Sequence, residues 1–346
     1  MTSTNISSSD HSAAAAVSRR RLISGAGALA ALGLAPAAWA QQPWPSRAIK
    51  LIVPFPPGGS TDAAGRVLGM AMQTRLGNQP VVVDNKAGAA GAIGTDAVAK
   101  AAPDGYTLGV GGVGSMVALE LLGRKLPYDA EKNLVCVGHM GSLGLAIGVR
   151  AGLAVRDLKE LVAYAKANPG RISYGTSGNG SPGHLAYEYL KSLTGMDGTH
   201  IPYRGDAPLV TDVLGGQVDV GVLTGSGAVA QAKNANLRLL AVTSTQRFAQ
   251  LPNVPTVAES GLPGVAGFDA TIWNVLVAPA GTPEAVVGKL NAALVAAMDD
   301  ANVISQFDGQ GLIPVKMTAR ETAAFVRRER EKWGKVVRAA NLKLTD

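Results

Sequence analysis

The strongest constraint on the fold is an alternation of short β-branched runs with helix-like segments. The run IKLIV at 49–53 precedes a stretch, 62–77, in which apolar residues recur at spacings of three and four. PVVVDN at 80–85 precedes GAIGTDAVAKAA, which ends at the turn PDG, and YTLGV follows at 106–110. Strands that alternate with helices in this way pair in parallel, with helices on both faces of the sheet. The chain is therefore predicted to be α/β.

The same rhythm continues through the middle and the end of the chain. VRDLKELVAYAKANPG predicts a helix, RISYGTS a strand, and SPGHLAYEYLKSLTG a helix with Ser181 as its N-cap. A strong strand is predicted at 271–279, followed by one helix capped by Thr282 and another that starts with a capping box of Thr318 and Glu321. These signals predict a second α/β lobe.

Two crossings of the chain set the expected lobe boundaries. LVCVGHMGSLGLAIGV leads from the first lobe into the second, and FDATIWNVLVAPAG leads back. Lobe 1 is predicted to comprise residues 42–141 and 268–346, and lobe 2 residues 142–267. A pair of crossings makes a hinge, so closure around a ligand is the expected motion.

The first forty residues have the organisation of an export signal. A charged SRRRLI is followed by a short apolar run rich in Gly and Ala, which ends in AWA before Gln41. This pattern predicts a signal peptide, residues 1–40, that is cleaved after Ala40 to leave a periplasmic protein. Arg19 and Arg20 indicate the twin-arginine route. An uncleaved N-terminal anchor is the alternative.

Charge and cysteine content exclude several classes of protein. Without residues 1–40, Lys plus Arg falls from 32 to 29 and Asp plus Glu from 25 to 24. The remaining excess is small, and the densest basic cluster, RRER at 327–330, contains an acid, so no nucleic-acid partner is predicted. Cys136 is the single cysteine, so no intramolecular disulfide can form.

Three loops rich in glycine, proline and small polar residues follow predicted strands: PFPPGGSTD at 54–62, TSGNGSPGH at 176–184 and YRGDAP at 203–208. Ligands of open α/β sheets sit beyond the C-terminal ends of the strands. Glycines let backbone N–H groups approach a ligand, and helix N-termini add unpaired donors and partial positive charge. The loops therefore predict a cradle that holds a carboxylate from two sides. Simple tight turns are the alternative.

No catalytic motif is found. His139, His184 and His200 are each best explained as structural, and the sequence has no HExxH, no Cys/His cluster and no GxSxG. Ser115, in GVGSMVAL, lies outside such an elbow and is interpreted as part of a cleft loop. A GxxxxGK[ST] nucleotide loop is also missing. We predict no catalytic residues, no metal and no cofactor.

Nearly all of the chain after residue 40 resembles a known protein family. The sequence is similar to the Bug family of periplasmic receptors, the extracytoplasmic solute-binding proteins of tripartite tricarboxylate transporters. The segments that carry the resemblance include WPSRAIKLIVPFPPGGSTD, QPVVVDNKAGAAGAIGTDAVAKAAPDGYTL, ISYGTSGNGSPGHLA, IPYRGDAP, LPNVPTVAESGLPG and VLVAPAGTP.

The resemblance implies a two-lobe periplasmic-binding-protein fold of type II. Each lobe would be a mostly parallel sheet flanked by helices, with the ligand in the cleft. It also implies a monomeric receptor that captures a small carboxylate and delivers it to a membrane permease with two subunits, or to a sensor. The family's ligand-binding loops fall on Phe55, Gly58, Gly59, Ser60, Thr61 and Asp62, on Ser177, Gly178, Asn179 and Ser181, and on Tyr203, Gly205 and Asp206.

Two segments depart from the family pattern. Residues 111–123 have no Asn-Pro pair, and residues 220–238 have neither the aromatic residue nor the proline that relatives often carry. Because both segments approach the cleft, the ligand's identity is not transferred from relatives. Two other classes of protein are the alternatives. A periplasmic enzyme acting on a small carboxylate needs a nucleophile or an acid/base pair, and the ligand domain of a transcription regulator needs an N-terminal helix-turn-helix.

Asp206 raises a hypothesis about ligand charge. Capping of the following helix and selection of the ligand are both open roles for this residue. If its carboxylate faces the cleft, it would repel a second ligand carboxylate and favour an ammonium, a hydroxyl or a ring N–H. The receptor would then prefer a monocarboxylate or an amino-acid-like ligand over citrate.

Overall fold

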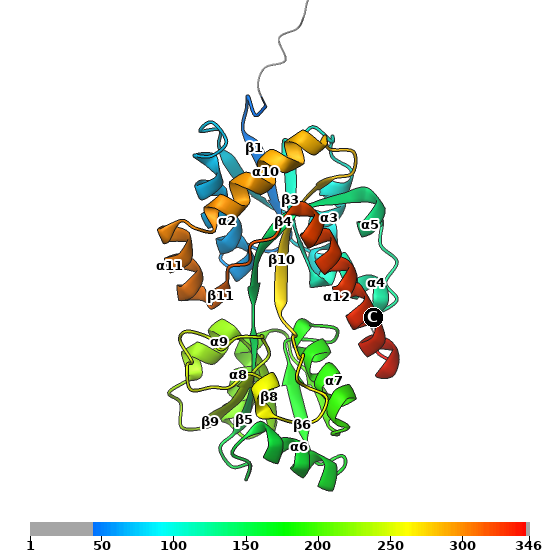
Figure 1. Ribbon diagram of the computed structural model, residues 1–346. Helices are drawn as coiled ribbons and strands as arrows, with labels where there is room; N and C mark the ends of the chain where they lie inside the picture. The colour runs from blue at the N-terminus through cyan, green and yellow to red at the C-terminus, as the bar shows by residue number, and fades with distance from the viewer. Residues whose placement is uncertain (1–43, 344–346) are drawn as a thin grey trace, which may run out of the picture. The chain divides into compact units, whose positions relative to one another are not determined.

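Two β-sheets flanked by helices make up residues 44–343, which the computed structural model describes (Figure 1). The signal-peptide prediction lies outside the described residues. The six-stranded sheet has the order β11-β4-β10-β3-β1-β2, and the five-stranded sheet has the order β7-β6-β8-β5-β9. The strands are β1 Ile49–Val53, β2 Val81–Asn85, β3 Thr107–Gly112, β4 Leu134–Leu143, β5 Leu145–Arg150, β6 Ser173–Thr176, β7 Thr199–Pro202, β8 Val220–Thr224, β9 Leu237–Val242, β10 Ile272–Pro279 and β11 Leu312–Ile313.

The helices cover the faces of these sheets (Figure 1). The α2 helix illustrates why they form, because its apolar residues recur at helical spacing and are buried at Ala64, Val67, Leu68 and Met72. The α-helices are α2 Ser60–Gln73, α3 Ala92–Ala99, α4 Leu119–Leu121, α5 Ala130–Asn133, α6 Leu158–Ala167, α7 Pro182–Thr194, α8 Asp206–Leu214, α9 Gly225–Gln231, α10 Glu284–Ala297, α11 Ala301–Gln310 and α12 Ala319–Ala339.

The predicted α/β class is confirmed, but both sheets are mixed rather than mostly parallel. Parallel pairing joins β1 to β2 and β3, and β6 to β7 and β8. In contrast, β10 runs antiparallel to β3 and β4, and β5 runs antiparallel to β8 and β9. The antiparallel pairing of β10 follows from the path of the chain. β4 and β5 lead the chain from the first sheet into the second, and β10 returns it to the first sheet in the opposite direction.

Local capping signals were accurate at two of three helix starts. Ser181 caps α7, and Thr318 and Glu321 form the predicted capping box of α12. The prediction for Thr282 was wrong, because the N-cap of α10 is Pro283. The Thr282 hydroxyl instead donates to the carbonyl oxygen of Pro279 at 2.7 Å, so a turn acceptor satisfies it.

Thr243 binds both crossings between the sheets. Its hydroxyl accepts from the Leu145 amide at 2.9 Å and donates to the Ala270 carbonyl at 2.8 Å. Its own amide donates to the Leu145 carbonyl, and its carbonyl accepts from the Ala270 amide. Gly144 separates β4 from β5, and β4 stays in the first sheet as far as Leu143, which pairs with β10 and β11. A fully buried hydroxyl thus fixes the spacing of the two crossings.

A second buried group, Glu329 on α12, ties the C-terminal helix to the first sheet. One of its carboxylate oxygens accepts from the indole N–H of Trp273 on β10 and from that of Trp333, each at 2.9 Å. Lys332 donates to the other oxygen. Trp333 also contacts the edge of Tyr189 on α7, so α12 packs against elements of both sheets.

We predict that Glu329→Ala lowers the free energy of unfolding by about 2–4 kcal/mol, because two buried indole N–H groups lose their acceptor. Urea unfolding of the purified protein measures this loss. Glu331→Ala, at an exposed position on the same helix, is the matched control and is expected to have little effect. Equal losses in the two variants would show that the shared acceptor is not important for stability.

Candidate functional site

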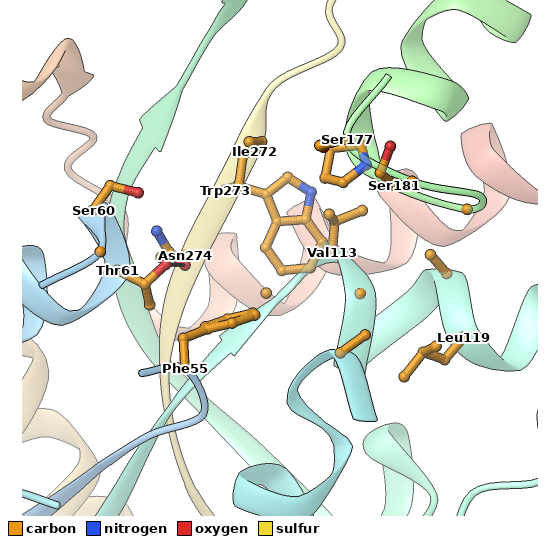
Figure 2. A pocket seen from close by; sticks show the side chains of 18 of the residues that line it. Phe55, Ser60, Thr61, Val113, Leu119, Ser177, Ser181, Ile272, Trp273 and Asn274 are labelled. Atoms are coloured by element: carbon orange, nitrogen blue, oxygen red, sulfur yellow. Dashed lines mark hydrogen bonds between the residues drawn. The ribbon is translucent and has the colours of Figure 1, made fainter. Parts of the chain in front are cut away.

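A cavity of about 730 Å³ is lined by residues of both sheets' loops. Its walls come from the loop after β1, the turn after β3, the loop after β6 and the start of β10. Figure 2 shows Ser60, Thr61 and Asn274 on one side of it and Ser177 and Ser181 on another.

The structure brings part of the predicted residue set together at this cavity. The predicted residues that line it are Phe55, Gly59, Ser60, Thr61, Ser177, Gly178, Asn179 and Ser181. The predicted residues that are not part of its lining are Gly58, Asp62, Ser115, Tyr203, Gly205 and Asp206.

The loop after β1 presents the N-terminus of α2 to the cavity. Gly58 has a φ of +89°, which favours glycine, and Gly59 is the N-cap residue of the helix. No side chain caps this end, so the N–H groups of the first turn are free to bind a ligand. These donors and the helix dipole favour an anion beside Gly59, Ser60 and Thr61.

Asp62 fixes the conformation of this loop from outside the cavity lining. Its carboxylate accepts from the Gly58 amide at 2.9 Å, from the Arg66 guanidinium at 3.0 Å and from the Asn85 side chain at 2.8 Å. Asn85 also donates to the carbonyl of Phe55. Burial alone raises the pKa of Asp62, but these hydrogen bonds outweigh it and lower the pKa to about 2. Asp62 is therefore an ionised positioning residue rather than a wall of the cavity.

The loop after β6 presents the start of α7 to the same cavity. Gly178 and Gly180 have φ values of +145° and +70°, which explains the glycines of this loop. The Ser181 hydroxyl accepts from the His184 amide at 3.3 Å and so caps the helix. This helix start is already partly satisfied, in contrast with that of α2.

Two stacked histidines support the second loop. The rings of His184 and His200 lie 3.8 Å apart and nearly parallel. The Nδ1 atom of His184 accepts from the Gly180 amide at 3.0 Å, and the Nε2 atom of His200 lies 2.8 Å from the Thr176 hydroxyl. The structural roles that the sequence favoured for these two histidines are consistent with these contacts.

The side chains of the third predicted loop, residues 203–208, bind other parts of the protein and do not line the cavity. The Asp206 carboxylate accepts from both the amide and the hydroxyl of Thr224, the N-cap residue of α9. The Tyr203 hydroxyl donates to Asp212 at 2.8 Å. The hypothesis that Asp206 sets the ligand's charge required it to face the cleft, and this carboxylate lies outside the lining, so the hypothesis has no support here.

Sequence reasoning missed an apolar wall. After β3 the chain forms a π-helical turn, Gly114–Ala118, which places Val113, Ala118 and Leu119 against the cavity. Ser115 is buried in this turn, and its carbonyl accepts from the Tyr128 hydroxyl. Ile272, Asn274 and Arg124 were also missed. The available signal was the apolar composition of residues 111–123, where the sequence departs from the family.

The chemistry of the lining suits binding of an anion. Backbone amides and the hydroxyls of Ser60 and Ser177 supply donors, whereas the Thr61 hydroxyl donates to Asn274 and the Ser181 hydroxyl to Thr176. Among the described residues that line the cavity, Arg124 alone carries a charge. Within residues 44–343, no group of three or more His, Cys, Asp or Glu side chains has a geometry that could hold a metal ion.

Comparisons with known proteins agree with this geometry. A family model described as "Tripartite tricarboxylate transporter family receptor" matches residues 64–342. Protein BugT of Bordetella pertussis is 40% identical over 302 residues, which cover 87% of this chain and 91% of BugT. The chain belongs to this receptor family. It is a solute-binding receptor, and the resemblance to the Bug family is confirmed.

Solved structures support the two-lobe fold of the receptor. An R. palustris protein solved with adipate has a TM-score of 0.73 and 31% identity, with 87% of this chain and 99% of that chain covered. MatC from Rhodopseudomonas palustris with bound malate has a TM-score of 0.69 and 32% identity, with 85% and 100% covered. In the receptor itself, no helix within residues 44–343 is both long and apolar enough to cross a membrane.

The histidine pair gives a prediction about pH. Burial lowers the pKa of His184 from 6.5 to about 4, with a smaller contribution from Lys191. Burial, and then the neighbouring His184, lower the pKa of His200 to about 4, although Glu188 opposes this shift. The unfolded chain therefore binds more protons than the folded protein at intermediate pH. Stability from these groups is complete above pH 6.5 and falls as the pH drops towards 4.

We expect His200→Gln to flatten this dependence, because one of the two suppressed titrations is removed. Thermal unfolding from pH 7 to pH 4.5 should show a smaller loss of Tm in the variant than in the unchanged receptor. His139, whose pKa burial also lowers to about 4, and Asp269, whose pKa burial raises, contribute equally to both proteins. Parallel Tm curves for the two proteins would contradict the prediction.

Proposed function

We propose that the receptor captures a small carboxylate between the α2 loop, residues 55–61, and the α7 loop, residues 177–181. The observation that carries the proposal is the uncapped N-terminus of α2, which faces a cavity also lined by the second loop. Backbone donors and a helix dipole at one cavity are suited to an anion. The adipate and malate complexes of the two related structures support a carboxylate as its chemical class.

The proposed lobes are residues 42–141 with 268–346, and residues 142–267. The division of strands between two sheets supports two lobes joined by two crossings, which lie at Gly144 and near Ala270, a few residues beyond the predicted boundaries. Because two crossings join the lobes within residues 44–343, rotation about them would bring the α7 loop onto a ligand held at α2. Thr243 would serve as a fixed point of that rotation.

Export and delivery complete the proposed role. Residues 1–40 would direct the chain to the periplasm and be removed after Ala40. The monomeric receptor would then pass its ligand to a membrane permease with two subunits, and a sensor is the alternative partner. The family description, a receptor of a tripartite transporter, supports the permease.

A binding role is favoured over the alternative of a periplasmic enzyme. Such an enzyme needs a nucleophile activated by a base, or an acid/base pair. The lining contains serine and threonine hydroxyls, but none of the described lining residues is His, Asp, Glu, Lys or Cys. No observation therefore supports catalysis at this cavity.

The decisive test replaces Gly59 with valine. Gly59 has a φ of −79°, and a Cβ atom there would have only the Pro56 carbonyl oxygen, at 3.9 Å, within 4 Å. Gly59→Val should therefore fold with an unchanged Tm, yet its branched side chain would block the approach of a carboxylate to the α2 amides. Calorimetric titration with the tightest acid from a thermal-shift panel of mono-, di- and tricarboxylates should show at least about a 100-fold loss of affinity, equivalent to roughly 2.7 kcal/mol.

Two further glycine variants control this test. Gly267→Val adds the same side chain at an exposed loop position with nothing within 4 Å, away from the cavity lining, and should bind normally. Gly58→Ala should instead lower the Tm, because its φ of +89° strains any residue with a Cβ. Unimpaired binding by folded Gly59→Val would refute the proposed anion site.

A further inference from the structure

We infer that Arg124 is a specificity-determining residue that selects ligands with a second acidic group. The ligand class would be an elongated acid: one carboxylate at the α2 and α7 loops, an apolar middle, and a second carboxylate at Arg124. This inference rests on the proposed function, because it assumes that the first carboxylate is bound at the loops.

Arg124 is an unpaired charge at the cavity. Its side chain is exposed, lines the cavity, and takes part in no ion pair or side-chain hydrogen bond among residues 44–343. The acids on neighbouring elements are already engaged: Glu120 pairs with Arg330, and Asp129 pairs with Lys132. A guanidinium that no protein group neutralises can make a bidentate contact with a ligand carboxylate.

The backbone fixes where this charge stands relative to the loops. The amide of Arg124 donates to the carbonyl of Leu119 at 2.9 Å, in a tight turn that ends α4. In Figure 2, Leu119 lies on the opposite side of the pocket from Ser60 and Thr61, with Phe55 and Val113 between them. The side chain of Arg124 therefore begins at the end of the cavity remote from α2.

The wall between these two polar ends is apolar. It is formed by Phe55, Val113, Ala118 and Leu119, with Ile272 from β10. Hydroxyl or carboxylate groups in the middle of a ligand would lose their hydration against this wall without gaining a partner, which costs free energy. Methylene or ring carbons would gain from the same burial. The arrangement thus favours an apolar spacer between two terminal carboxylates.

The number of charges in the lining also favours a dicarboxylate over a tricarboxylate. A tricarboxylate brings three negative charges, whereas the described lining offers one cationic side chain and the uncapped end of α2. With Asp206 bound to Thr224 and outside the lining, no described lining residue repels a second carboxylate. The preference expected from the sequence for a monocarboxylate is thereby replaced by a preference for a dicarboxylate.

The test combines matched ligands with matched variants. Adipate and hexanoate share a six-carbon chain and differ by one carboxylate, and terephthalate and benzoate form a second pair with a rigid spacer. Calorimetry should show that the dicarboxylate of at least one pair binds the unchanged receptor about tenfold or more tightly than its partner. Arg124→Met should abolish that difference and leave the monocarboxylate's affinity unchanged. Lys125→Met, next in the chain and absent from the lining, should leave both affinities unchanged.

The salt dependence of binding is a second measurement, and it would not change if Arg124 had only a structural role. The advantage of the dicarboxylate should shrink as ionic strength rises in the unchanged receptor, and should be absent from Arg124→Met at low and at high salt. Equal affinities within both ligand pairs, or a dicarboxylate advantage that survives in Arg124→Met, would overturn this inference while leaving the anion site at α2 intact. Failure of every acid in the panel to bind, with folded protein, would overturn the inference and the proposed function together.

Discussion

The hydroxyl of Thr243 joins the two places where the chain passes between its sheets, next to the segments that place the α2 loop and the α7 loop at one cavity. It binds Leu145 at the start of β5 and Ala270 just before β10. The α2 loop belongs to the first sheet and the α7 loop to the second, so neither sheet alone can surround a ligand. The shared cavity exists because these two crossings hold the loops opposite each other.

Three carboxylates bind groups of the scaffold, and none of them lines the cavity. Asp62 accepts three donors behind the α2 loop, Asp206 accepts from Thr224, and Glu329 accepts from two indoles. Arg66 pairs with Asp62 and offsets part of its charge, and among the described lining residues Arg124 is the charged one. A binding protein for anions needs this separation as much as it needs donors.

Sequence patterns predicted what is local and missed what depends on the path of the chain. The alternation of strands and helices, the glycine-rich loops and the capping box of Thr318 and Glu321 all follow from nearby residues. The antiparallel pairing of β10 does not, since it depends on where the chain returns. The sequence predicted Asp62 as a ligand residue, but its carboxylate accepts a hydrogen bond from the side chain of Asn85, which lies on β2 and is distant in the sequence. An apolar run such as Val113–Leu119 cannot be distinguished from core before the opposing loop is in place.

The two helix ends at the cavity differ in a way that suggests an order of binding. Ser181 caps α7 with its own hydroxyl, whereas no side chain caps α2. In the proposed mode of binding, a carboxylate at α2 would supply the acceptor that the first turn lacks. At α7 the same carboxylate would add to a helix start that already has an acceptor, so its gain there is smaller. In the proposed mode of binding, the first sheet would be the stronger initial docking surface, and the α7 loop would contribute mainly once the lobes close.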